Sequence, residues 1–73
     1  MIDKMVEVFK TNVAEFAQSK FLIDQLYHHF PESKINFDLD DCDKILRVEA
    51  NNVFSNTVIE LLRQNGYFAE VLL

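Results

Sequence analysis

The sequence predicts a single small α+β domain, in which an antiparallel sheet of four strands carries two helices on one of its faces. Apolar residues recur at every second position in four segments, which predicts four strands, and at helical spacing in two others, which predicts two helices. The order of these segments along the chain predicts how they assemble. With 73 residues, 49% of them hydrophobic, the chain is long enough for one core only, so residues 1–73 are expected to form one domain.

The first half of the chain predicts a strand followed by a helix. Residues 4–9 alternate around two β-branched valines, which is typical of a strand. Asn12, followed three residues later by Glu15, resembles a capping box, so a helix is expected to begin at Val13. Pro31 ends that helix. Its predicted core-facing stripe, with Leu26 at the margin, consists of Val13, Phe16, Ile23, Tyr27 and Phe30.

The second half predicts a hairpin, a helix and a last strand. Residues 34–39 and 44–50 alternate on either side of a polar turn, which indicates a β-hairpin. Residues 55–65 carry apolar side chains on one side of a helix, and Gly66 supplies its left-handed stop. Residues 67–73 alternate again and predict the last strand.

The order strand, helix, strand, strand, helix, strand, with right-handed crossovers, predicts the ferredoxin-like arrangement. In that arrangement the first strand lies between the third and the fourth. The predicted core consists of apolar residues that lie on matching faces of the strands and helices: Val6, Val8, Phe16, Ile23, Tyr27, Ile35, Phe37, Leu46, Val48, Val58, Leu62, Ala69 and Val71.

Two stretches, KINFDLDDCDKILRVE and VIELLRQNGYFAEVL, resemble the heavy-metal-associated domain of copper chaperones and metal-transporting ATPases. The resemblance is most specific over residues 65–70, and in element order it covers essentially the whole chain. The family holds soft ions such as Cu(I) with a Cys-x-x-Cys motif between the first strand and the first helix. Alignment on the helix puts these positions at Phe16 and Ser19, and alignment on the strand puts them near Val13 and Phe16. The resemblance therefore implies a ferredoxin-like fold without the family's metal site.

Three other residues are weak candidates for metal chemistry. Cys42, the only thiol, lies in the acidic turn DLDDCD, where nearby carboxylates disfavour the thiolate. The turn lacks the glycine and the distal glutamate of a calcium loop. His28 and His29 are consecutive at the end of the first helix, about 100° apart, and suit the negative end of the helix dipole better than they suit one ion. We therefore predict no catalytic residue, no cofactor and no metal site.

Charge and composition exclude further classes. A formal charge of −5 repels phosphate backbones, which argues against nucleic acid. Apolar runs of two or three residues are far shorter than the ~20 that span a bilayer. A single cysteine suggests a reducing, cytoplasmic setting. The sequence thus favours a small non-enzymatic interaction or regulatory module on a metallochaperone-like scaffold. The alternative is a divergent copper- or zinc-trafficking protein that uses Cys42 or the histidine pair.

A candidate interaction surface follows from the expected strand faces. If Val6 and Val8 face the helices, the pleat puts a stripe of other apolar residues on the helix-free face. Such a stripe, with the phenylalanine of the first strand as its centre, predicts self-association or docking of a protein partner. Ordinary cross-strand packing is the alternative explanation. The residues of the stripe are Phe9, Ile45, Phe68 and Leu72.

Overall fold

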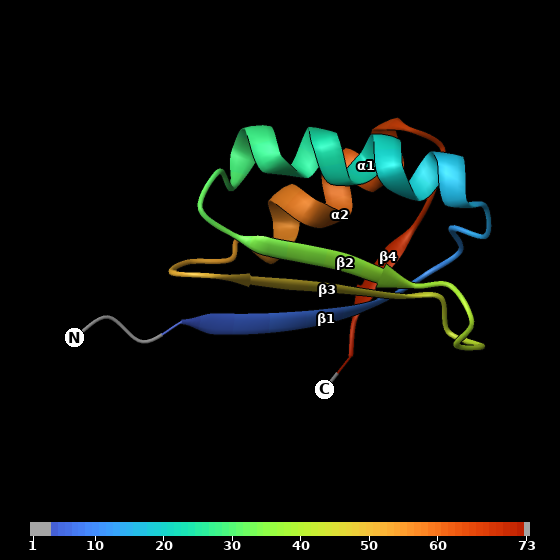
Figure 1. Ribbon diagram of the computed structural model, residues 1–73, viewed down its shortest axis with the longest axis horizontal. Helices are drawn as coiled ribbons and strands as arrows, with labels where there is room; N and C mark the ends of the chain where they lie inside the picture. Colours follow the sequence, from blue (N-terminus) through green and yellow to red (C-terminus); the bar gives the residue numbers. More distant parts are fainter. Residues whose placement is uncertain (1–3, 73) are drawn as a thin grey trace.

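The computed structural model describes residues 4–72 and shows one sheet with both helices on the same face of it (Figure 1). The elements in chain order are β1 (Met5–Thr11), α1 (Phe16–His29), β2 (Lys34–Asp38), β3 (Ile45–Ala50), α2 (Ser55–Gln64) and β4 (Ala69–Val71). Neighbouring strands are antiparallel, and their order in the sheet is β2-β3-β1-β4. The predicted α+β fold, with a four-stranded antiparallel sheet and two helices, is confirmed, and it is compatible with a ferredoxin-like fold.

The core lies between the sheet and the two helices, and every element contributes to it. Its fully buried side chains are Phe9, Val13, Leu22, Leu26, Leu46, Val48, Val58 and Leu62. The predicted core residues that are buried are Ile35, Leu46, Val48, Val58, Leu62 and Ala69. Those that pack partly buried against the core are Ile23, Phe37 and Val71.

The sequence predicts the wrong face of β1 as the one that packs against the helices. Phe9 is fully buried and lies opposite Leu46, whereas Val6 is 45% exposed and Val8 lies opposite Arg47 on the helix-free face. The prediction that the two valines belong to the core is wrong, and so is the prediction that Phe9 lies on the open face. A phenyl ring removes more apolar surface from water than a valine does, so burial of the ring is favoured. Because side chains alternate, that choice moves both valines outward.

α1 begins three residues later than the sequence predicts. Its N-cap is Glu15, which makes no side-chain capping hydrogen bond. The Oδ1 atom of Asn12, the expected cap, instead accepts a hydrogen bond from the N–H of Phe68 over 2.9 Å. Val13 is fully buried in the connection between β1 and α1. A long-range bond to the residue before β4 thus replaces the local cap.

α1 is also rotated relative to the prediction. Its buried residues are Ser19, Leu22 and Leu26. Phe16, which was expected in the core, is 71% exposed, and Tyr27 is 38% exposed. The side of the helix that packs on the sheet is therefore about a quarter turn away from the predicted stripe.

The hairpin and the second helix are confirmed. Residues 39–44 connect β2 to β3, and Lys44 closes this loop with a φ of 46°. α2 begins at the predicted residue, and Gly66 follows it with a φ of 88°, as the left-handed stop requires. β4 is shorter than the predicted strand over residues 67–73, of which residue 73 lies outside the described residues.

Thr11 connects β1 to the loop between β2 and β3. Its N–H donates a hydrogen bond to the carbonyl of Asp43 (3.0 Å), and its hydroxyl donates to the carbonyl of Lys44 (2.6 Å). The same hydroxyl oxygen accepts a bond from the N–H of Val13 (3.2 Å). Thr11 is buried, so water cannot replace these contacts if the hydroxyl is removed.

Replacing Phe9 with alanine should lower the free energy of unfolding by about 3–5 kcal/mol, because it leaves a cavity at the centre of the core. The matched change Val6→Ala on the exposed face should cost less than about 1 kcal/mol. Urea unfolding measures both, and Phe9→Leu serves where the alanine variant does not fold. Equal losses for Phe9→Ala and Val6→Ala would contradict the observed faces of β1.

The Thr11→Val variant should lower the free energy of unfolding by about 1–3 kcal/mol, since it leaves two backbone groups without their hydrogen-bond partner. Thr57→Val is the matched control, because the Thr57 hydroxyl makes no hydrogen bond within residues 4–72. Thermal and urea unfolding compare the two variants. A Thr11→Val protein as stable as the control would show that the hydroxyl does not hold the loop.

Candidate functional site

Cys42 is exposed in the loop between β2 and β3. One ligand atom each from Asp41, Cys42 and Asp43 lies within 4.8 Å of the other two. Both carboxylates, however, already have structural roles. Asp41 Oδ1 accepts a hydrogen bond from the Asp43 N–H (2.8 Å), and Asp43 Oδ1 pairs with Lys10 Nζ (3.8 Å). The closeness of the three groups is therefore explained by the turn itself.

His28 and His29 occupy the last turn of α1, and both are exposed. This turn lies at the opposite end of the domain from the loop between β2 and β3 (Figure 1). The structure therefore does not bring the histidines together with Cys42, and one molecule cannot combine the two candidate metal sites.

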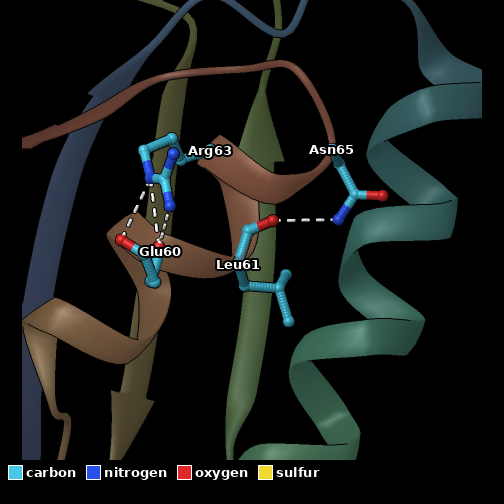
Figure 2. Close-up of polar contacts among 4 residues, drawn as sticks. All are labelled: Glu60, Leu61, Arg63 and Asn65. Carbon is cyan, nitrogen blue, oxygen red and sulfur yellow. Dashed lines mark hydrogen bonds and ion pairs between the residues drawn. The ribbon is translucent and has the colours of Figure 1, made fainter.

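The C-terminal end of α2 holds the charged pair shown in Figure 2. Arg63 Nε donates to both carboxylate oxygens of Glu60 (3.0 and 3.1 Å), and Asn65 Nδ2 donates to the Leu61 carbonyl (2.9 Å). The hydrogen bond from Arg63 lowers the pKa of Glu60, and the same bond raises the pKa of Arg63. The pair thus stabilises the helix fully at pH values above the ordinary carboxyl pKa. This stabilisation is lost as the pH falls through the lowered pKa of Glu60. Because both groups are exposed, we assign the pair to helix stability.

The helix-free side of the sheet, here called the open sheet face, carries a band of apolar side chains. Ile45, Phe68 and Leu72 lie at positions that alternate with the core residues, so three of the four residues predicted for the stripe are on this face. Val8 takes the central place expected for Phe9, and its carbonyl accepts a hydrogen bond from the Leu72 N–H (2.8 Å). The apolar residues of the open sheet face are Val6, Val8, Ile45, Phe68 and Leu72.

Charged side chains of both signs surround this band. Lys34 lies opposite Glu49, and Lys10 lies opposite Glu70, so each basic residue faces an acidic one across neighbouring strands. Arg47 also bonds to the carboxylate of Glu49. The basic residues of the face are Lys10, Lys34 and Arg47. Its acidic residues are Asp38, Glu49 and Glu70. The open sheet face is therefore electrically balanced.

A cavity of about 780 Å³ lies between α1 and the edge strand β2, and we call it the α1–β2 groove. Along α1 it is lined by Phe16, Ile23 and Tyr27, the residues that the sequence analysis assigned to the core. Phe37 and Leu39 line it on the side of β2. Its charged lining residues are Lys20, Asp24, Asp38 and Asp40.

Sequence reasoning missed this groove, although its signal is visible in α1. Apolar residues of that helix cover more than one side, since Leu22 and Leu26 face the core while Phe16 and Tyr27 do not. An amphipathic helix with one partner needs only one apolar side. The second apolar side of α1 therefore indicates a second surface, separate from the side that packs on the sheet.

Neither helix in the described part of the chain is long and apolar enough to cross a membrane. Comparison of the chain with family models, with curated proteins and with solved structures found no significant match. Its function has to be inferred from its own residues and their geometry.

Proposed function

We propose that the chain is a small, non-enzymatic protein-interaction module of the cytosol that associates with a second copy of itself through the open sheet face. In this proposal the fold is ferredoxin-like, and the chain is related to the heavy-metal-associated domains but lacks their metal motif. The observation that carries the proposal is the band of apolar side chains on a sheet face that no helix covers.

The apolar band crosses the middle of the sheet, and its centre is Val6, Val8 and Leu72. Val8 of the central strand has Leu72 beside it on one side. On the other side, Ile45 lies two residues along β3 from Arg47, the residue opposite Val8. Phe68, just before β4, is exposed on the same face, with the pair of Lys10 and Glu70 between it and the row of Val8 and Leu72. Apolar side chains that adjoin across three strands form the kind of patch that marks a contact site, whereas single exposed apolar residues are ordinary.

The charges of the open sheet face favour a second copy as the partner. The whole chain has a formal charge of −5, yet the paired strand residues of this face include three basic and three acidic side chains. The excess negative charge therefore lies elsewhere, and two copies that approach through other surfaces repel each other. A two-fold contact between two open faces can set basic groups of one copy against acidic groups of the other.

The connection between β1 and α1 supports a role without the family's metal chemistry. In one alignment the thiol positions fall on Phe16 and Ser19, and the Ser19 hydroxyl is buried and donates to the Phe16 carbonyl (2.7 Å). In the other alignment one position falls near Val13, which is fully buried in the core. Neither hydroxyl nor hydrocarbon groups replace thiolates as ligands of a soft ion.

The alternative function is metal trafficking through Cys42 or the histidine pair. One observation favours it: the Cys42 thiol and the flanking carboxylates could all reach one small ion. Against it, a single thiol is a poor site for Cu(I), which prefers two. The carboxylates around Cys42 also disfavour the thiolate that binds metal.

Sedimentation equilibrium tests the self-association. The wild type should form dimers as its concentration rises, and a Phe68→Ser/Leu72→Ser double variant should dissociate at least about tenfold more readily, because it removes two of the five apolar side chains of the band. Phe21→Ser, an equally exposed change on α1, is the matched control and should dimerise like the wild type. A wild type that stays monomeric at millimolar concentration would refute the proposal.

Metal titration separates the two functions. Equimolar Zn²⁺ or Cu⁺ should leave the amide resonances of residues 10–16 unchanged and should raise the melting temperature of the wild type no more than that of Cys42→Ser. A His28→Ala/His29→Ala variant controls for the histidines. An increase of several degrees that disappears in either variant would instead support the trafficking function.

A further inference from the structure

The α1–β2 groove differs from the open sheet face in position and in charge. It lies on the helix side of the domain, between α1 and the edge of the sheet formed by β2. The side of α1 that lines it is a continuous helical stripe, in which Phe16, Lys20, Ile23 and Tyr27 follow one another at spacings of three or four residues. Phe16 is the most exposed of the three apolar residues, and Lys20 Nζ lies 5.7 Å from the centre of its ring.

Phe16 and Tyr27 on this side of α1 lie outside the core, whereas Ile23 between them packs partly buried against it. Leu22 and Leu26 fill the space between α1 and the sheet, and both are fully buried. Large aromatic side chains in water gain free energy when a partner covers them. Phe16 and Tyr27 therefore form an apolar wall that is available to a ligand.

β2 forms the opposite wall and is a free sheet edge. It pairs with β3 on one side only and is the last strand in the sheet order. The outward backbone N–H and C=O groups of such a strand can pair with an added strand. β2 spans five residues, Lys34–Asp38, so an extended segment of similar length matches it.

Acidic groups dominate the groove. Asp24 projects from α1, Asp38 ends β2, and Asp40 follows in the loop, whereas Lys20 is the only basic residue among residues 4–72 that lines the groove. None of the three carboxylates forms an ion pair within residues 4–72. The groove therefore attracts a segment that carries basic side chains.

We propose that the α1–β2 groove binds an extended, basic segment of a partner protein, which adds to β2 as a fifth strand. Alternate apolar side chains of the segment pack against Phe16, Ile23 and Tyr27, and lysine or arginine side chains at its ends pair with the aspartates. This proposal does not depend on the apolar band of the open sheet face, because no residue of that band takes part in it; Asp38, at the edge of the sheet, belongs to the charged residues of both surfaces.

A synthetic peptide provides the probe. It is a capped heptapeptide with valine at positions 3 and 5, threonine at positions 2, 4 and 6, and arginine at positions 1 and 7, so that valine and arginine share one face of the strand. It is titrated into the isotopically labelled chain. We expect saturable shifts in the amide resonances of residues 34–40 and of the groove side of α1. A peptide with glutamate in place of arginine, and one with N-methylated threonines that cannot donate hydrogen bonds to the edge, should bind at least about tenfold more weakly.

Two variants test the walls of the groove. Phe16→Ser should weaken binding of the arginine peptide at least about fivefold, whereas Phe54→Ser, a matched change at an exposed phenylalanine outside the groove, should not. Asp24→Asn/Asp38→Asn should weaken it about threefold to fivefold and reduce its dependence on salt. Dispersed proton spectra confirm that each variant is folded.

The titration can overturn the proposal in three ways. The absence of saturable shifts at millimolar peptide would exclude the site. Equal binding of the glutamate and arginine peptides would refute the charge selection. Shifts centred on Val8 and Leu72, lost in the Phe68→Ser/Leu72→Ser variant but not in Phe16→Ser, would assign the peptide to the open sheet face instead.

Discussion

The burial of Phe9 is the constraint on which the rest of the structure depends. β1 is a central strand, and its register with both neighbours puts Leu46 of β3 and Val71 of β4 opposite Phe9 on the helix side. Because side chains alternate with a period of two, this row decides the orientation of every other residue in three strands. Val8 lies on the open sheet face for that reason. The surface proposed for self-association is thus a direct consequence of where one phenyl ring is buried.

The second constraint is that α1 and α2 share one face of a four-stranded sheet (Figure 1). Each helix can bury only one side against such a surface. α2 satisfies this with Val58, Leu61 and Leu62, all buried on one side of the helix. α1 has apolar residues for two sides and buries the one with Leu22 and Leu26, which leaves Phe16 to the groove. The groove is therefore the result of a helix that is more apolar than its place in the fold requires.

Local sequence patterns predicted the type and order of the elements, because periodicity and capping act within a few residues. The stop at Gly66 and the start of α2 at Ser55 are examples. Alternation, however, does not say which side of a strand faces the core, and residues 4–9 are apolar on both sides. For the same reason three of the four predicted stripe residues lie on the open sheet face and the fourth does not.

Long-range contacts account for what local patterns could not predict. Asn12 satisfies the local rule for a helix cap, but its side chain bonds to Phe68, 56 residues away, and α1 begins later. The groove depends on the distance between α1 and β2, which only the assembled fold defines. The sequence shows that its lining residues are apolar, but it does not show that they are exposed.

The positions of the two surfaces determine how they can act together. The open sheet face is on the side of the sheet away from the helices, and the α1–β2 groove is on the helix side at one edge. A two-fold contact between open faces turns the helices of both copies outward, so each copy keeps its own groove accessible. A partner with two basic segments can then occupy both grooves of one dimer, and its second segment binds at the high effective concentration that a tether provides. The balanced charge of one surface and the acidic charge of the other keep the two contacts distinct, since a basic segment has no electrostatic preference for the open sheet face.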